Sequence, residues 1–354
     1  MLISSVSSGK LAGKIVQDKE VYCKGLFLSA RWFIVSQCAG EGTNLIILPD
    51  KESAEYCASD LYSLVDGDVV FFLPDSGKGV EKSNYKSTLG VQRTSAVGKI
   101  ISNSDNKSKL FIVTYPEALV EFIPGMVEIK ESVMKVCVGQ EISHEAIKEK
   151  LAAQGFERED FVSAPGQYSI RGSIIDIFSY SFNDPFRVSF FGDEIEKIHV
   201  FDCNTQLSKE ERREIEVFPD LVGEETFKGQ SIVSLLPEET VVWLDSYDIY
   251  KEREFIKELD AFRKVFLQVP LGKNGGNAVK FSIAPQPVFN KNFEILTSDI
   301  RKNMEYGYRV FIFSEKKSQI ERLKSILTEN NGLVPAFVEG KNIHSGFIDH
   351  DDRI

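Results

Sequence analysis

Residues that build metal, disulfide and catalytic sites are scarce in this 354-residue chain. Its five cysteines, at positions 23, 38, 57, 137 and 203, are odd in number and include no C-x-x-C pair, so neither a disulfide framework nor a structural zinc site is expected. None of the four histidines, at 144, 199, 344 and 350, belongs to an H-E-x-x-H motif, and no G-x-S-x-G elbow occurs. We expect reduced thiols, no metal and no cofactor.

Long apolar runs are also missing. No stretch approaches the ~20 apolar residues that span a bilayer, and the amino terminus has no signal-peptide core, so we expect a cytoplasmic protein without a membrane partner. The 42 basic and 53 acidic residues give a net charge of -11. Because such a surface repels phosphate, DNA binding is expected to be weak at most.

The residues that are present indicate a globular α/β protein with more than one domain. Apolar residues make up 42% and charged residues 27% of the chain, and its length exceeds the ~100 to 200 residues of one domain. Short apolar runs at 45–48, 69–73 and 110–113 predict buried strands. A helix that begins after Pro49-Asp50 separates the first two, and this order predicts a parallel sheet.

From about residue 127 the pattern becomes alternating and rich in turns. A helix over 145–154, capped by Ser143 and ended by Gly155, precedes strands that predict an antiparallel sheet. After residue 218 the first pattern returns with a strand at 241–244 and a charged helix over 249–262.

These patterns predict four segments. A parallel-sheet domain of the phosphate-loop type, made of 1–126 and 218–285, is interrupted by a mostly antiparallel α+β domain at 127–217. A linker at 272–277 leads to a small α/β domain at 286–354, with a helix at 293–304, a strand at 310–313 and a second helix containing Ile320, Leu323 and Ile326. We expect this last domain to be incomplete.

A parallel sheet of this type often carries a nucleotide site, but the sequence lacks the phosphate-binding motif. No Gly-Lys pair is followed by Ser or Thr, so both the phosphate-binding lysine and a metal ligand are missing. Gly25, Leu28, Ser29 and Ala30 stand where the loop is expected, and we interpret them as a degenerate nucleotide site without catalytic residues. Asp245 ends a strand as a metal-binding acid does, but Ser246 follows it, and a plain strand end is the simpler reading.

Two smaller constellations have a simple structural reading. His144 suits a capping or first-turn position on its helix. His344 and His350 lie near Asp349, Asp351 and Asp352, which would suit either a metal site or, as we prefer, a solvated polar segment.

The segment with the most specific pattern is residues 165–206. It contains PGQYSIRGSIIDIF at 165–178, FRVSFFGDEI at 186–195 and FDCNTQ at 201–206. These runs closely resemble the second domain of UvrB and of the transcription-repair coupling factors (Mfd). The run QPVFNKNF at 286–293 and the run GYRV at 307–310 resemble the third domain of the coupling factors. UvrB keeps an intact phosphate loop where this chain has a degenerate one, which also favours the coupling factors over UvrB.

The resemblance implies a role in nucleotide excision repair. In that family this module is UvrB-like and binds UvrA, and the matching positions place Arg171, Arg187 and Phe191 on the UvrA-binding surface. RNA polymerase binding and ATP-driven DNA translocation belong to later domains of the family, which have no counterpart in this sequence. The resemblance therefore implies recruitment of UvrA without a motor.

The residue pattern bears on the same surface independently. Side chains alternate along a strand, so if Phe186, Val188 and Phe190 fill the core, then Arg187 and Phe191 face outward. Arginine and aromatic side chains are typical interface anchors. In the alternative reading, Phe191 packs under a loop and Arg187 pairs with an acid such as Asp193 or Glu194.

Two neighbours complete the expected surface. Gly172 would mark a bulge that redirects Arg171, and Asp176 would be a structural acceptor or ion-pair partner. Residues 127–217 carry 18 acidic and 11 basic side chains, a net charge of -7, so a few arginines suit an acid-bearing protein better than DNA. An ATPase or helicase of the UvrB type with an atypical phosphate loop, and a DNA-binding module, are the alternatives.

Overall fold

The structure is a computed structural model that describes residues 6–67, 69–77, 84–182, 184–221, 229–246, 248, 253, 255–269, 278–290, 292–328 and 335–354. The chain clusters into two compact units. The first comprises residues 1–70, 106–116 and 238–354, and the second comprises 71–105 and 117–237. The four-segment division and its boundaries stay a prediction.

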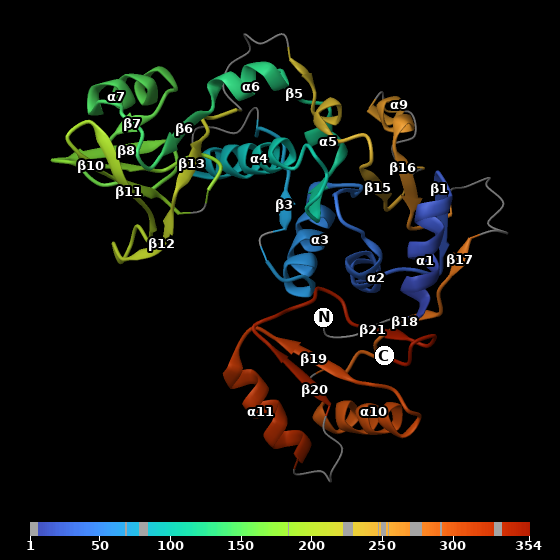
Figure 1. Cartoon of the computed structure of the whole chain (residues 1–354). Helices are drawn as coiled ribbons and strands as arrows, with labels where there is room; N and C mark the ends of the chain where they lie inside the picture. The colour runs from blue at the N-terminus through green and yellow to red at the C-terminus, as the bar shows by residue number, and fades with distance from the viewer. Residues whose placement is uncertain are drawn as a thin grey trace. The chain divides into compact units, whose positions relative to one another are not determined.

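A parallel sheet forms the centre of the first unit (Figure 1). Its order, including β3 where the chain passes to the second unit, is β17-β1-β16-β15-β2-β4-β3. The strands are β1 (Glu20–Lys24), β2 (Thr43–Ile47), β3 (Val70–Phe72), β4 (Leu110–Thr114), β15 (Val241–Leu244), β16 (Arg263–Phe266) and β17 (Val279–Lys280). All five residues of β2 and of β4 are buried, as strands covered on both faces should be.

Helices α1 (Val6–Gln17), α2 (Ala30–Cys38) and α3 (Lys51–Leu64) pack side by side in this unit. Helix α3 begins where the sequence predicts, because the Asp50 carboxylate accepts a hydrogen bond from the backbone N–H of Ser53. The charged helix expected over 249–262 is confirmed in part, since residues 255–261 are helical whereas Arg253 lies in a bend. Of the residues described there, Phe255–Glu258 form α9 and Leu259–Ala261 form the 3-10 helix η2, whereas residues 249–252 and 254 lie outside the described part.

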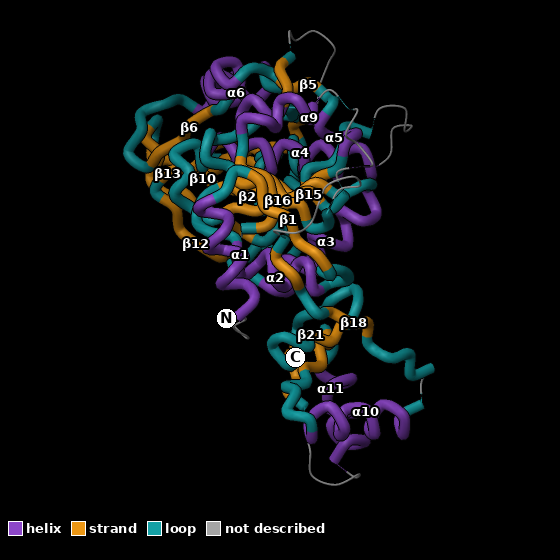
Figure 2. The backbone as a smooth tube through the Cα atoms, turned by 90° about the vertical axis from the view of Figure 1, so that its right-hand side faces the viewer, coloured by secondary structure: helices purple, strands orange, loops and turns teal. Residues whose placement is uncertain are grey.

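The last part of the first unit has the elements that the sequence predicts. They are α10 (Phe293–Glu305), β19 (Phe311–Ser314) and α11 (Lys317–Thr328). A further strand that was not predicted, β20 (Ala336–Glu339), pairs parallel with β19. Strands β18 (Ile283–Pro285) and β21 (Phe347–Asp349) pair antiparallel, and Figure 2 shows them side by side near the C-terminus. The predicted linker at 272–277 lies outside the described residues.

A mostly antiparallel sheet organises the second unit, in the order β12-β11-β10-β9-β8-β7. Its strands are β7 (Glu157–Arg158), β8 (Gln167–Arg171), β9 (Ile174–Ile177), β10 (Phe186–Phe191), β11 (Glu194–Phe201) and β12 (Ser208–Arg212). Only β7 and β8 pair parallel among the neighbours recorded in this sheet. The predicted combination of a parallel and a mostly antiparallel sheet is confirmed.

Further helices and strands complete the second unit. They are α4 (Asn84–Ser102), α5 (Pro116–Leu119), β5 (Phe122–Ile123), α6 (Met126–Ser132), β6 (Met134–Cys137), α7 (His144–Ala153), β13 (Glu214–Val217), β14 (Gln230–Ser231) and the 3-10 helix η1 (Ile232–Leu235). The Ser143 hydroxyl caps α7 by accepting from the Ala146 N–H, as predicted. His144 is the first residue of that helix, and its ring lies 4.1 Å from the Phe190 ring.

All five cysteines are free thiols. Burial raises the pKa of the Cys23 and Cys57 thiols, which keeps them protonated and unreactive. In the described ranges, no helix is long and apolar enough to cross a membrane, and no group of three or more His, Cys, Asp or Glu is placed to hold a metal ion.

Candidate partner-binding surface

The outer face of the antiparallel sheet carries the three residues that the sequence singles out. On β10 the side chains of Phe186, Val188 and Phe190 are buried in the core, as the alternation predicts. Phe191, on the opposite face at the end of the strand, is 80% exposed. The alternative in which a loop covers Phe191 is therefore wrong, and the ring is available to a partner.

A single buried carboxylate holds both arginines of this face. Asp176 on β9 lies directly opposite Arg187 on β10, and its side chain is 1% exposed. It accepts from Arg187 Nε at 2.8 Å and Nη2 at 2.9 Å, and it also accepts from Nη2 of Arg171. The predicted role of Asp176 as an ion-pair partner is confirmed. Arg187 does pair with an acid, as the alternative reading held, but the acid is Asp176 and not Asp193 or Glu194.

Arg187 is held from two further sides. Its Nη2 also donates to the side-chain oxygen of Gln206 at 2.8 Å, and the guanidinium lies 4.1 Å from the centre of the Phe201 ring. The hydrogen bonds to Asp176 raise the pKa of Arg187, against the opposing effect of partial burial. With 20% of its side chain exposed, Arg187 is a fixed charge rather than a mobile one.

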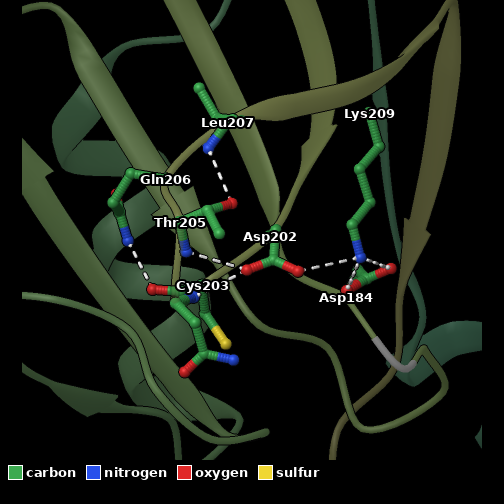
Figure 3. Close-up of polar contacts among 8 residues, drawn as sticks. Asp184, Asp202, Cys203, Thr205, Gln206, Leu207 and Lys209 are labelled. Atoms are coloured by element: carbon green, nitrogen blue, oxygen red, sulfur yellow. Dashed lines mark hydrogen bonds and ion pairs between the residues drawn. The ribbon is translucent and has the colours of Figure 1, made fainter.

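Gln206, which accepts this hydrogen bond from Arg187, lies in a tight turn between β11 and β12. Figure 3 shows the polar contacts of this turn. The Asp202 carboxylate accepts from the backbone N–H groups of Asn204 and Thr205, both at 2.9 Å. Its other oxygen pairs with Lys209, which also contacts Asp184. This network fixes the turn, in which Gln206 adopts a positive φ of 61°.

The turn is expected to respond to acid. The backbone N–H of Thr205, followed by Lys209, lowers the pKa of Asp202 to about 2, so the folded form releases this proton more readily than the unfolded chain. Its contribution to stability is complete above the ordinary aspartate pKa and is lost as the pH falls toward 2. The amide shifts of Asn204 and Thr205, followed by NMR, should titrate with a midpoint near 2. A midpoint near 4, as in an unstructured reference peptide, would contradict this.

Arg171 contacts an aromatic residue that the sequence reasoning missed. Its guanidinium lies 4.7 Å from the centre of the Phe161 ring, which is 61% exposed. Gly172 does not form the predicted bulge: Arg171 pairs with Ile174, so Gly172, with φ 59°, and Ser173 make a two-residue hairpin turn. Phe161 lies between a run of four charged residues and Val162, and nothing in this pattern signals a surface role.

The predicted degenerate nucleotide site lies in the first unit, between β1 and α2. An added side-chain carbon at Gly25 would come 2.3 Å from the carbonyl oxygen of Phe281, so the missing side chain makes room for this chain's own backbone. Leu28 has a positive φ of 56°, and its carbonyl oxygen accepts from both the backbone N–H and Nε of Arg31. Ala30, fully buried, begins α2.

The hydroxyl of Ser29 is occupied by protein groups. It donates to Asp60 on α3 at 2.5 Å and accepts from the backbone N–H of Ser345 at 2.9 Å. Asp60 also accepts from the His344 N–H at 2.6 Å, and burial raises its pKa. In the same unit Arg31 forms an ion pair with Asp245, the strand-end acid.

Residues 341–345 form a loop segment, which we call the strap, that contacts α3 at several points. Besides the two contacts above, Lys341 pairs with Asp66 at 2.9 Å and the Asn342 N–H donates to Ser63 at 3.0 Å. The His344 ring stacks on Tyr56, with centroids 3.6 Å apart. His350 is engaged by the Tyr308 hydroxyl at 2.7 Å, so both histidines of the suspected metal constellation have protein contacts.

The comparison with known families first defines a class of domain. Residues 134–221 match the family described as the UvrB interaction domain. Sheet β8–β12 lies within this range, so the whole Arg171, Asp176 and Arg187 cluster belongs to the matched segment.

Individual relatives are transcription-repair-coupling factors. The chain is 30% identical over 204 residues to that of Bacillus subtilis, which is 57% of this chain and 17% of the relative. It is 24% identical over 207 residues to that of Myxococcus xanthus, again 57% and 17%, and 30% identical over 124 residues to that of Escherichia coli, or 33% and 10%. The resemblance to the N-terminal region of these proteins is confirmed, and the match spans 10 to 17% of their length.

Proposed function

We propose that this chain is a binding module of transcription-coupled nucleotide excision repair that recruits UvrA and hydrolyses no ATP. The observation that carries the proposal is the exposed Phe191 ring on the same sheet face as two anchored guanidinium groups. An exposed aromatic ring beside fixed arginines is the composition of a protein-binding hot spot. The match to the UvrB interaction domain and the name of the relatives support the biological setting.

The region around Ser29 supports the absence of ATPase activity in the proposal. The Ser29 hydroxyl, which would be the candidate metal or phosphate ligand, is bound by Asp60 and Ser345. Asp245, the candidate metal-binding acid, is paired with Arg31. An ATP complex would have to break these contacts without the lysine that normally compensates.

Truncating Phe191 is expected to weaken UvrA binding substantially. Phe191→Ala removes an exposed ring without touching the core, so stability should change little while the affinity falls by about 30-fold, corresponding to ~2 kcal/mol. Calorimetric titration of the 354-residue chain with purified UvrA measures this. Phe122→Ala, at a phenylalanine that is 72% exposed, is the matched control and should bind like the unmodified chain. Equal affinity of the two variants would show that the assigned surface is wrong.

The enzymatic and DNA-binding alternatives predict different behaviour. We expect no rise in melting temperature with Mg·ATP and no ATP turnover above background, because the Ser29 hydroxyl and Asp245 are already paired. We also expect no appreciable affinity for duplex DNA at low salt, given the net charge of -11. Turnover that disappears on changing Ser29 would favour a UvrB-like ATPase, and tight binding with a steep salt slope would favour a DNA-binding module.

A further inference from the structure

In the cluster of Arg171, Asp176 and Arg187, two positive groups share a single negative one. One carboxylate that is 1% exposed serves two guanidinium groups, which leaves a net charge of about +1 on the cluster at neutral pH. If the arginines served only to attract an acidic partner, a carboxylate between them would weaken the attraction. Its position therefore calls for a reason other than charge.

The geometry supplies that reason. Asp176 forms the two parallel hydrogen bonds of a fork with Arg187 and takes a third from Arg171. Each guanidinium is also stacked on a ring, Arg187 on Phe201 at 4.1 Å and Arg171 on Phe161 at 4.7 Å. Two long side chains that would otherwise sample many rotamers are thus fixed before a partner arrives.

Donor groups remain on both arginines for a partner. Within the described residues, Nη1 of Arg187 and Nε and Nη1 of Arg171 make no hydrogen bond. An acidic side chain of a partner protein would meet donors that are already oriented, and so the partner would not have to immobilise either arginine. Ordering flexible side chains is one of the free-energy costs of forming an interface, and it is avoided for side chains that are already fixed.

We propose that Asp176 is a positioning residue of the binding surface, which holds Arg171 and Arg187 for a carboxylate-bearing face of the partner without contacting that partner itself. This rests on the proposed function, since the partner meant is UvrA. Asp176 acts through the two arginines, and Gln206 and the Asp202 turn support it from the side of β12.

The variant Asp176→Asn tests the proposal, because attraction by charge and positioning predict opposite changes in the affinity for UvrA. The substitution keeps the shape and makes the surface more positive, so attraction by charge alone predicts equal or tighter binding of UvrA. Positioning predicts binding at least tenfold weaker, because the amide N–H₂ group cannot accept from a guanidinium. Glu149→Gln removes one negative charge at an exposed position of α7 in the same domain and should leave the affinity unchanged. Equal or tighter binding by folded Asp176→Asn would overturn the proposal.

A second measurement tests whether Asp176 immobilises Arg187 and needs no UvrA. In the full chain with ¹⁵N-labelled arginine, the Nε–H of Arg187 should exchange slowly with water and should exchange at least tenfold faster in Asp176→Asn. Unchanged exchange would refute the positioning role whether or not UvrA binds. If the unmodified chain fails to bind UvrA while this exchange responds as expected, the proposed function is wrong and the arrangement of the arginines stands.

A further variant covers the case in which Asp176→Asn does not fold. Arg187→Lys keeps the positive charge but cannot form the fork with Asp176, so positioning again predicts at least tenfold weaker binding. Affinity equal to that of the unmodified chain would overturn the proposal.

Discussion

Reversing the charge of Arg187 is expected to abolish UvrA binding. Arg187→Glu removes the central guanidinium and places a carboxylate against buried Asp176, so both the donors and the local positive charge are lost. We expect the affinity to fall more than about 100-fold, since like charges across an interface cost several kcal/mol. A lower melting temperature should accompany the change, because Asp176 loses its bidentate partner.

The measurement is a calorimetric titration against UvrA at a temperature where circular dichroism shows the variant to be folded. Arg158→Glu is the matched control, because it makes the same charge change at an exposed position of β7 in the same sheet. It should bind like the unmodified chain. A folded Arg187→Glu variant that still binds tightly would remove this sheet face from the interface.

Removing the Asp60 carboxylate should release the strap at 341–345. Asp60→Ala deletes the acceptor of the Ser29 hydroxyl and of the His344 N–H, and a buried donor left without a partner costs about 1 to 3 kcal/mol. We therefore expect lower thermal stability together with faster amide hydrogen exchange at His344 and Ser345. Exchange measured by mass spectrometry on peptides that cover the strap reports this directly.

Asp66→Ala provides the comparison. Asp66 contacts the same strap through Lys341, but its side chain is 82% exposed, so solvent and salt screen the pair and little should change. If Asp60→Ala left the exchange of the strap as slow as Asp66→Ala does, then the Asp60 contacts would not hold it.

The sequence predicted those features that depend only on residues close together in the chain, namely helix starts and the alternation of side chains along a strand. The caps at Asp50 and Ser143 fix the starts of α3 and α7, and both follow from residue types within three positions. The alternation along β10 predicted which side chains face outward, because a pleated strand has a period of two wherever it lies.

Contacts that depend on strand register or on distant segments could not be predicted in this way. The alternation along β10 places Arg187 on an outer face but does not say that Asp176 stands opposite it, since that depends on how β9 and β10 align. Gly172 was interpreted as a bulge because a glycine in a strand pattern suits both a bulge and a hairpin turn. The strap contact between Ser29 and Ser345 joins residues 316 positions apart, with no sequence signal.

Strand β12 bounds the antiparallel sheet, and its exposed residues Ser208–Arg212 read SKEER. Four charged side chains in a row on an outermost strand oppose the addition of a further strand from another molecule. Recognition by strand addition, which many sheets use, is therefore disfavoured along this border. A partner can still bind through the side chains on the face of the sheet. Binding of that kind does not require an open edge strand, through which copies of the protein could pair into fibres.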